Sequence, residues 1–304
     1  MAKKKQSSVE ITETERLERI KRQVVIAIFS DDFLMERLVL KGGNAINLLL
    51  DVGTRASVDI DLSMESDFPP EEREKILKGL ESRLQATFAP DNLTVFDVTL
   101  EEKPETISPE VATFWGGYDV TFKLIENHVA KKCAGDLTAM RRNSLRIGAK
   151  GKFEIDISKF EYCAPKRSFD MDGLQVFVYT TEMLVAEKLR AICQQMPEYG
   201  PVVKRTRPGS ARARDFFDIH SLVHRYKLEM ASQENLELVR LIFEAKRVPP
   251  ALLGKIRGFR EFHRPDFQSV KDTVKPGVTL QSFDFYFDFV LKLAEQLLKA
   301  LGNE

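Results

Sequence analysis

The chain has 304 residues, of which 43% are hydrophobic and 30% are charged, a composition that fits a folded protein and excludes general disorder. Basic and acidic residues both number 46, so the net charge is zero and the chain is not a generally basic nucleic-acid coat. Contact with nucleic acid would therefore need local basic patches, for which solvated loops are the alternative interpretation. The two candidate patches are Lys204, Arg205, Arg207, Arg212 and Arg214, and Arg141, Arg142, Arg146, Lys150 and Lys152.

The cysteines and the hydropathy pattern indicate where the protein works. Cys133, Cys163 and Cys193 are far apart and odd in number, which fits neither a disulfide framework nor a zinc cluster. No apolar run approaches the roughly 18 residues that a membrane span needs. We therefore expect a cytoplasmic protein that does not engage a membrane, and we expect a monomer.

The first half of the chain alternates helical and strand patterns. Apolar residues recur at helical spacing over 14–28, where Thr12 or Thr14 could cap the helix, and again over 70–88, after a proline. A short helix is predicted over 45–50 and another over about 130–142. Strand patterns cover 58–62, 93–100, 118–125, 153–157 and 174–179.

The second half of the chain is predicted to be mostly helical, over 181–196, 212–226, 235–245 and 281–301. This order indicates an α+β protein with two lobes. We place the boundary near residue 175, with a catalytic lobe over 1–175 and a mostly helical lobe over 176–304.

The strand predicted over 58–62 has an unusual acidic face. Asp59 and Asp61 are two residues apart, so on a strand their carboxylates leave the same face at a spacing of roughly 6–7 Å. Carboxylates this close raise each other's pKa or recruit a cation unless bases pair with them. Magnesium prefers oxygen ligands and shares them with phosphates, so this pattern predicts a divalent metal site for phosphoryl transfer. An exposed edge strand is the alternative.

A glycine turn precedes this strand. In Lys41-Gly42-Gly43-Asn44 the glycines would let the backbone approach phosphates, and the helix after them would direct its amides at the same place. Asn44 could donate its side-chain amide. Arg55 could pair with the acids or contact substrate, and an ordinary tight turn is the alternative.

A third carboxylate is expected from the strand over 153–157. Glu154 and Asp156 share a face there, and we favour Asp156, whose shorter side chain suits rigid coordination, either to complete the metal site or to act as a base. A half-exposed strand with polar residues outward would give the same pattern.

The order of these segments resembles the AbiEii toxin family of nucleotidyltransferases, relatives of the MenT toxins in the polymerase-beta-like superfamily. Four segments carry the resemblance, in the family's order and over much of the chain: Leu40-Lys41-Gly42-Gly43-Asn44-Ala45, Ser57-Val58-Asp59-Ile60-Asp61-Leu62, Thr181-Glu182-Met183-Leu184-Val185-Ala186-Glu187-Lys188-Leu189 and Arg214-Asp215-Phe216-Phe217-Asp218-Ile219. The superfamily commonly has serine or threonine where this chain has Asn44.

The resemblance implies a nucleotidyltransferase fold, with a mixed sheet flanked by helices and a C-terminal helical lobe. It implies a toxin of a type IV, abortive-infection-like toxin–antitoxin system that uses magnesium or manganese to transfer nucleotides from an NTP to RNA, in relatives to the 3′ acceptor end of tRNA. A cognate antitoxin would counter it. A protein or small-molecule acceptor, or a non-catalytic nucleotide-binding module, are the alternatives.

Two charged residues lie on apolar helical stripes. Lys188 lies within the stripe that includes Val185 and Leu189, and Asp215 borders Phe216 and Ile219. A buried lysine needs an anion nearby. The resemblance assigns Lys188 to the triphosphate and Asp215 to the catalytic constellation, and a salt bridge between helices is the alternative.

Two weaker patterns lie on the helix over 212–226. Asp218 is one turn from Arg214, which predicts a helical ion pair. His220 and His224 have the spacing of metal-binding pairs, but no glutamate follows His220 as in a zincin motif, so we interpret both as ordinary core or surface residues.

Overall fold

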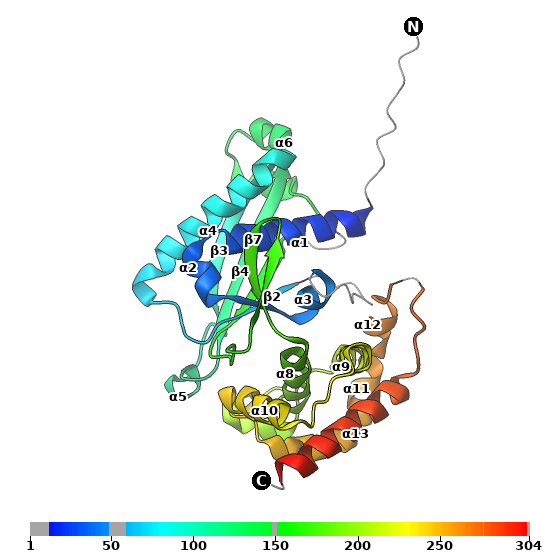
Figure 1. Cartoon of the computed structure of the whole chain (residues 1–304). Coiled ribbons are helices and arrows are strands. Elements are labelled where there is room, and N and C mark those ends of the chain that lie inside the picture. The colour runs from blue at the N-terminus through cyan, green and yellow to red at the C-terminus, as the bar shows by residue number, and fades with distance from the viewer. Residues whose placement is uncertain (1–11, 49–58, 148–150, 276, 303–304) are drawn as a thin grey trace.

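A mixed β-sheet forms the centre of the first part of the protein (Figure 1). The computed structural model describes residues 12–48, 59–147, 151–275 and 277–302. The strand order is β3-β4-β5-β2-β1-β7-β6, in which β5–β2 and β1–β7 are parallel pairs and the other neighbours are antiparallel. The strands are β1 (Val39–Lys41), β2 (Ile60–Ser63), β3 (Leu93–Lys103), β4 (Gly117–Glu126), β5 (Phe153–Ser158), β6 (Arg167–Met171) and β7 (Leu174–Val178).

Helices cover the apolar face of this sheet. α1 (Glu13–Phe29) packs against α4 (Arg73–Phe88), α4 lies along β3, and α2 (Asp32–Arg37) contacts α1 and β7. Ile28 of α1, Leu80 of α4 and Ile157 of β5 surround one small cavity in this core. Side chains alternate along a strand, so the polar residues between these apolar ones face the other side of the sheet.

The helix predicted over 14–28 is confirmed, and its start has a clear cause. Thr12 accepts a hydrogen bond from the Glu15 backbone amide at 3.2 Å, and the Glu15 carboxylate accepts one from the Thr12 backbone amide at 2.8 Å. This reciprocal capping satisfies amides that have no partner inside the helix.

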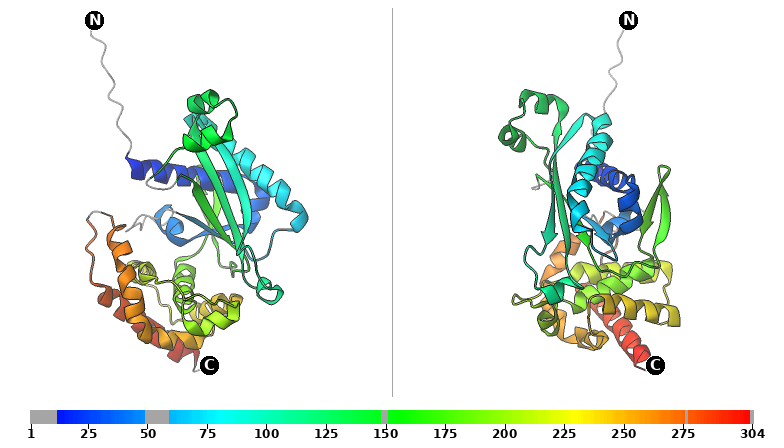
Figure 2. Two further views of the ribbon diagram at one scale, coloured as in Figure 1. Left: turned by 180° about the vertical axis from the view of Figure 1, so that it is seen from behind. Right: turned by 90° about the vertical axis from the view of Figure 1, so that its left-hand side faces the viewer.

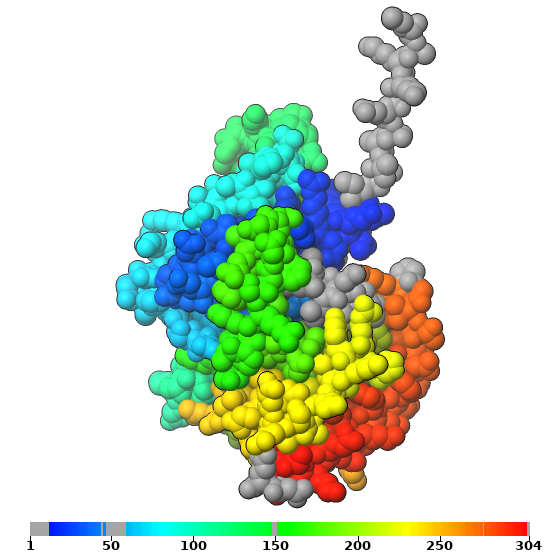
Figure 3. Space-filling view, viewed as in Figure 1, coloured from blue at the N-terminus to red at the C-terminus, as the bar shows by residue number. Residues whose placement is uncertain are grey.

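The second part of the chain is helical, as predicted, and lies beneath the sheet in Figure 1. α8 (Thr181–Cys193) packs against α9 (Ala213–Tyr226) and α10 (Gln233–Ala245), and α13 (Phe283–Leu301) packs against α9. Figure 3 shows the surfaces of α10 and α13, in yellow and red, below the strands. Within the described ranges, no helix is both long enough and apolar enough to cross a bilayer.

Short helical elements complete the chain. The α-helical ones are α3 (Gly42–Leu48), α5 (Pro109–Ala112), α6 (Asn127–Lys132), α7 (Leu137–Arg142), α11 (Arg260–His263) and α12 (Phe267–Lys271). The 3-10 ones are η1 (Pro70–Glu72), η2 (Ala89–Asp91), η3 (Pro197–Val203), η4 (Pro250–Phe259) and η5 (Arg264–Asp266).

Several predicted element boundaries differ from the structure. The helix predicted over 130–142 is two helices, α6 and α7, because Ala134 and Gly135 adopt positive φ angles of 48° and 85° that interrupt it. Strand β6 was not predicted, since Arg167–Asp170 are exposed and carry no apolar alternation. The predicted lobe boundary at residue 175 falls inside β7, and the change from sheet to helix comes at Thr181.

A buried ion network joins the sheet to the helical part. Glu161, which follows β5, accepts two hydrogen bonds from Arg190 of α8, at 2.6 and 3.3 Å. Its carboxylate also lies 3.5 Å from the ammonium of Lys246 and 3.7 Å from that of Lys41. Burial alone would raise the pKa of Glu161, but the charges of Arg190, Lys246 and Lys41 hold it well below its ordinary value. One buried carboxylate thus balances cations from three regions of the chain.

We predict that Glu161→Gln lowers the free energy of unfolding by about 3–5 kcal/mol, because it leaves buried cations without their counter-charge. Glu198→Gln is the control, since Glu198 pairs with Lys255 at the surface and such pairs contribute about 1 kcal/mol or less. Urea unfolding followed by circular dichroism measures both. Equal stability of the two variants would contradict a structural role for the network.

Candidate active site

Carboxylates form a row across the polar face of the sheet. Asp61 on β2 is in register with Asp156 on β5, and Asp156 is in register with Asp119 on β4. Residues directly opposite each other on paired strands lie on the same face, with Cβ atoms typically about 5 Å apart. On its other side Asp61 is in register with Lys41 of β1. The sheet therefore brings Asp61 and Asp156 together, as predicted.

Asp59 is placed differently from the prediction. Strand β2 begins at Ile60, so Asp59 lies in the bend before it and is exposed. It remains close enough to Asp61 to contribute to the electrostatics of that carboxylate. Asp59 and Asp61 therefore do not occupy one regular strand face, and Asp156 is the carboxylate held in register with Asp61.

Gly42 opens α3 directly against Asp61. Its φ angle is +67°, and a Cβ atom there would lie 2.2 Å from Oδ2 of Asp61. Only glycine leaves room for the carboxylate at this turn. The predicted glycine turn that opens a helix is present, although α3 begins at Gly42 itself. The side chain of Asn44 and the whole of Arg55 lie outside the described residues, so their predicted contacts with substrate stay predictions.

The Asp61 carboxyl is held in an unfavourable electrostatic environment. Burial has the largest effect and raises its pKa to about 7. The Lys41 ammonium opposes this shift, while the charges of Asp156, Glu187 and Asp59 add to it. The charged form of Asp61 is therefore disfavoured mainly by burial, and a cation beside it would stabilise that form.

Lys103 occupies the outer side of the row. Its ammonium donates to Oδ2 of Asp156 at 2.6 Å, and it is half exposed at the end of β3. Burial raises the pKa of Asp119, the charge of Lys103 opposes that shift, and Glu154 and Asp156 add to it. Glu154 itself pairs with Lys152 at 3.0 Å, away from Asp61. The structure thus favours Asp156 over Glu154 as the second carboxylate.

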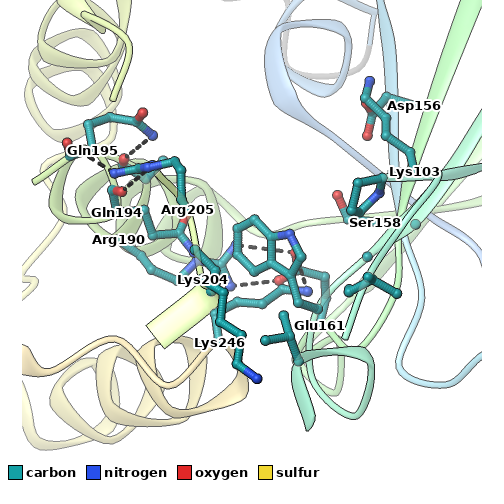
Figure 4. A pocket seen from close by; sticks show the side chains of 18 of the residues that line it. Lys103, Asp156, Ser158, Glu161, Arg190, Gln194, Gln195, Lys204, Arg205 and Lys246 are labelled. Atoms are coloured by element: carbon teal, nitrogen blue, oxygen red, sulfur yellow. Dashed lines mark hydrogen bonds and ion pairs between the residues drawn. The ribbon is translucent and has the colours of Figure 1, made fainter. Parts of the chain in front are cut away.

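A cleft of about 830 Å³ lies beside the row, between the sheet and α8. Figure 4 shows Lys103, Asp156 and Ser158 on its sheet side and Arg190, Gln194 and Gln195 on the opposite side. Its lining also includes Lys41, Glu187, Trp115, Arg212 and the loop residues Lys204, Arg205, Thr206 and Arg207.

Lys41 lines the cleft but is already engaged. Its ammonium donates to Glu187 at 2.7 Å and to the Ser158 hydroxyl at 3.2 Å. Burial would lower the pKa of Lys41, but the charges of Glu187 and Glu161 outweigh burial and raise it. Lys41 therefore stays protonated and contributes a fixed positive charge between Asp61 and α8.

Lys188 and Asp215 are buried, as their positions on apolar stripes predicted, but they meet each other. The Lys188 ammonium donates to Asp215 at 3.1 Å and to Asp218 at 2.7 Å, which joins α8 to α9. Asp218 was predicted to pair with Arg214 one turn away, but the structure gives Lys188 as a partner. Arg214 donates to the Ser269 hydroxyl at 3.1 Å. Neither Lys188 nor Asp215 is one of the described residues that line the cleft. The contacts therefore favour the interhelical salt bridge.

Arg212 is the cation that connects this buried pair to the cleft. Its guanidinium donates to Asp215, whose charge is the main cause of the raised pKa of Arg212. The charges of Glu187 and Asp61 act in the same direction, and Arg212 lines the cleft. Asp215 therefore holds Arg212 toward the acidic row, which gives the predicted catalytic aspartate a positioning role.

A metal ion at this row would need further ligands from the substrate. In the described ranges of the chain, no group of three or more His, Cys, Asp or Glu side chains could hold a metal ion. Magnesium, however, is commonly held by one or two carboxylates together with water and substrate phosphates. The pair Asp61 and Asp156 fits such an ion, because the two carboxylates are in register on one face of the sheet.

The two histidines of α9 pack with aromatic rings. His220 stacks on His224 with ring centroids 5.6 Å apart, and it meets Phe285 and Phe289 edge-on. His220 thus packs among aromatic rings, and His224 is an exposed residue beside it.

The site contains residues that the sequence analysis missed. Asp119 lies in the alternating run Tyr118 to Phe122, which is the same signal that pointed to Asp156. Glu187 had no comparable signal, because α8 is buried around most of its circumference and apolar spacing does not single out its charged positions.

Residues 24–289 match the sequence profile of the family described as nucleotidyl transferase AbiEii toxin, type IV TA system. The chain belongs to the AbiEii family of nucleotidyltransferase toxins. The family resemblance of the four sequence segments is thereby confirmed, and the protein is a toxin-family nucleotidyltransferase. No curated protein matches this AbiEii chain.

Three solved structures are similar to this AbiEii chain at low identity. JHP933 from Helicobacter pylori has 16% identity, covers 96% of this chain and 94% of its own, and has a TM-score of 0.47. A "putative nucleotidyltransferase from H. pylori" has 16% identity, coverage of 96% and 97% and a TM-score of 0.49. An antigenic nucleotidyltransferase-like protein from Paracoccidioides brasiliensis has 15% identity, coverage of 85% and 94% and a TM-score of 0.37.

We predict that Gly42→Ala reduces nucleotide transfer by this AbiEii protein on the order of 100-fold, because the new methyl group displaces the Asp61 carboxylate. Gly173→Ala is the matched control: Gly173 has a φ angle of +81°, but nothing lies within 4 Å of its added Cβ. Both variants carry similar backbone strain, so only the contact with Asp61 differs. Transfer of labelled nucleotide measures the effect, and equal activity of the two variants would show that the Asp61 position is unimportant.

We predict that Lys188→Met lowers the free energy of unfolding by about 3–5 kcal/mol, since Asp215 and Asp218 lose the buried ammonium that they share. Adding Asp218→Asn should restore part of this stability, because it removes one of the two buried negative charges that have lost the ammonium. Denaturant unfolding compares the single and double variants. If Lys188→Met kept full stability and raised only the KM for nucleotide, the assignment of Lys188 to the triphosphate would be right instead.

Proposed function

We propose that this toxin transfers a nucleoside monophosphate from an NTP to RNA, at the 3′ acceptor end of tRNA, with the help of a divalent metal ion. The observation that carries this proposal is the in-register pair Asp61 and Asp156 beside a cleft whose far wall is basic. Asp156 lines this cleft together with Arg190, Arg207 and Arg212, and such a mixture of carboxylate and cations is suited to a substrate that carries both phosphates and metal.

Asp61 and Asp156 are the residues that would hold the metal, and Asp59, whose charge acts on Asp61, is proposed as a third ligand. Magnesium or manganese bound there would neutralise triphosphate charge and activate the attacking oxygen. Lys103 would leave Asp156 when the cation arrives, because both compete for the same carboxylate oxygen. The half-exposed position of Lys103 makes this exchange sterically simple.

Arg212 and the glycine turn are the groups proposed to bind the triphosphate. Arg212 is fixed by Asp215 and lines the cleft, so its remaining donors can meet phosphate oxygens without a large loss of side-chain freedom. Gly42 leaves the backbone bare beside Asp61, and we propose that this turn, with Gly43, lets phosphate approach the backbone there. The cleft volume of about 830 Å³ lies within the usual range of about 300–1,000 Å³ for ligand pockets.

The reaction proposed here is a single displacement at phosphorus. The hydroxyl oxygen of the RNA end forms a bond to the α-phosphorus, and the bond from that phosphorus to the bridging oxygen breaks. Pyrophosphate leaves, and a basic oxygen of the site takes the hydroxyl proton, for which Asp156 is the candidate.

The acceptor is proposed from the chemistry of the cleft mouth. Arg207 and Arg212 line the cleft, which suits a phosphodiester backbone, whereas Lys204 of the same loop pairs with Glu110. In this part of the predicted basic patch Arg205 has a structural task, because its guanidinium donates to the backbone carbonyls of Gln194 and Gln195 at the end of α8. A cognate antitoxin would protect the cell that carries this enzyme.

We predict that incubation with labelled NTP, magnesium and total tRNA labels the tRNA band, and that excess chelator abolishes the labelling. Asp61→Asn and Asp156→Asn should each lower the rate by about 100-fold or more, since each removes a metal-binding oxygen charge. Testing the four NTPs separately identifies the preferred nucleotide.

The control for these variants is Glu101→Gln, which removes a carboxylate from the exposed end of the same row, opposite Asp119. It should retain activity close to wild type. Label that persists in chelator would contradict metal dependence, and label that appears in protein bands of a lysate but never in RNA would contradict the acceptor.

A further inference from the structure

The α6–α7 hairpin concentrates positive charge in a chain whose net charge is zero. Residues 127–147 contain five basic side chains, Lys131, Lys132, Arg141, Arg142 and Arg146, and one acidic side chain, Asp136. Asp136 is used locally, because it caps α7 by accepting from the Thr138 and Ala139 amides. The hairpin therefore carries a net charge of about +4 on 21 residues, counted as five basic minus one acidic residue.

Four of these cations are available at the surface. Lys131, Lys132, Arg142 and Arg146 are exposed. Within the described ranges, no carboxylate lies within 4.0 Å of their charged nitrogens, whereas most other arginines in those ranges form ion pairs. By contrast, two cations of the loop 204–207 beside the cleft already have partners. Lys204 pairs with Glu110, and Arg205 donates to the Gln194 carbonyl at the end of α8. Backbone phosphates would find more unengaged positive charge on the hairpin than at the cleft mouth.

The hairpin is anchored as a small module of its own. Phe96, Ile125 and Met140 form a hydrophobic cluster separate from the main core, and Val129 and Cys133 pack against it. A β-bulge after Phe96 places Asp97 where it accepts two hydrogen bonds from Arg141, at 2.8 and 2.6 Å. Arg141 and Lys123 hold the pKa of Asp97 well below its ordinary value. Arg141 thus fixes the hairpin, and the other four cations face outward.

The same two strands connect this hairpin to the cleft. β3 and β4 pair from Leu93 with Glu126, next to α6, to Lys103 with Gly117, which both line the cleft. Eleven residues at about 3.3 Å per residue span roughly 35 Å. Figure 2 shows the hairpin at the end of these strands far from the helical lobe. This length is comparable to one turn of a nucleic-acid duplex, which is about 34–36 Å in DNA.

We infer that the α6–α7 hairpin is a second docking surface for the phosphate backbone of the acceptor RNA, about one duplex turn from the end that reacts in the cleft. The inference rests on the proposed function, because it assumes that the acceptor is RNA. Its surface chemistry favours RNA over the alternatives. Membrane-binding helices carry an apolar face and protein interfaces an apolar centre, whereas Leu137 is the only large apolar side chain of the described hairpin that is markedly exposed, at 51%.

The test replaces Lys131, Lys132, Arg142 and Arg146 with glutamine. A matched control replaces Arg225, Lys227, Lys292 and Lys299, four exposed cations of the helical lobe, in the same way. Transfer of labelled nucleotide is measured on total tRNA and on a four-base-pair RNA hairpin with the same single-stranded 3′ end. Fluorescence anisotropy measures binding of each RNA and of anionic phospholipid vesicles, and thermal unfolding verifies that each variant is folded.

The hairpin variant should raise the KM for tRNA by about tenfold or more and leave the KM for the short RNA unchanged. Its salt slope for tRNA binding should be smaller by about three, since each lost phosphate contact contributes nearly one. The control variant should match wild type in both assays.

Equal KM values for tRNA in the hairpin and control variants would overturn the inference. So would a hairpin variant that lost vesicle binding and kept tRNA binding, or one whose KM rose equally for both RNAs. If the wild-type protein labelled no RNA at all, the proposed function itself would fail, and this result is distinct because it appears before any variant is compared.

Discussion

The register between β2 and β5 is the constraint on which the site depends. It fixes Asp61 and Asp156 side by side on the polar face of the sheet, while the apolar residues between them bury the opposite face under α1 and α4. Gly42 then closes over Asp61 with no room for a side chain. Burial raises the pKa of Asp61 to about 7 against the opposing charge of Lys41, and the neighbouring carboxylates add to the shift. A cation bound beside Asp61 would favour its charged form.

The helical part supplies the opposing charge and its support. Glu187 and Arg190 of α8 reach the cleft, and Arg212 is directed there by Asp215, which Lys188 holds from behind. The ion network around Glu161 ties the same helix to the sheet. Buried ion pairs contribute little net stability, because desolvation offsets their attraction. Here the ion pairs position the helices: they fix the distance between the acidic row on the sheet and the basic residues on the opposite side of the cleft.

Local patterns were enough to predict the acidic strands, the glycine turn and most helices. Alternation around Asp61 and Asp156 survives in the structure because each strand buries one face only. What the sequence could not supply are contacts between segments distant in the chain. Lys188 was recognised as buried, but its partners depend on how α9 packs. Asp59 lies outside the strand because β2 starts at Ile60. The helix predicted over 130–142 is divided into α6 and α7 where Gly135 permits a turn, which the apolar pattern does not record.

Anomalous scattering from crystals of the protein with manganese and a non-hydrolysable NTP analogue would locate the metal directly. We expect one strong manganese peak between the carboxylates of Asp61 and Asp156, shared with phosphate oxygens, and a Lys103 ammonium displaced from Asp156. Nucleotide bound in the cleft with no manganese at Asp61, and with Lys103 still on Asp156, would contradict it.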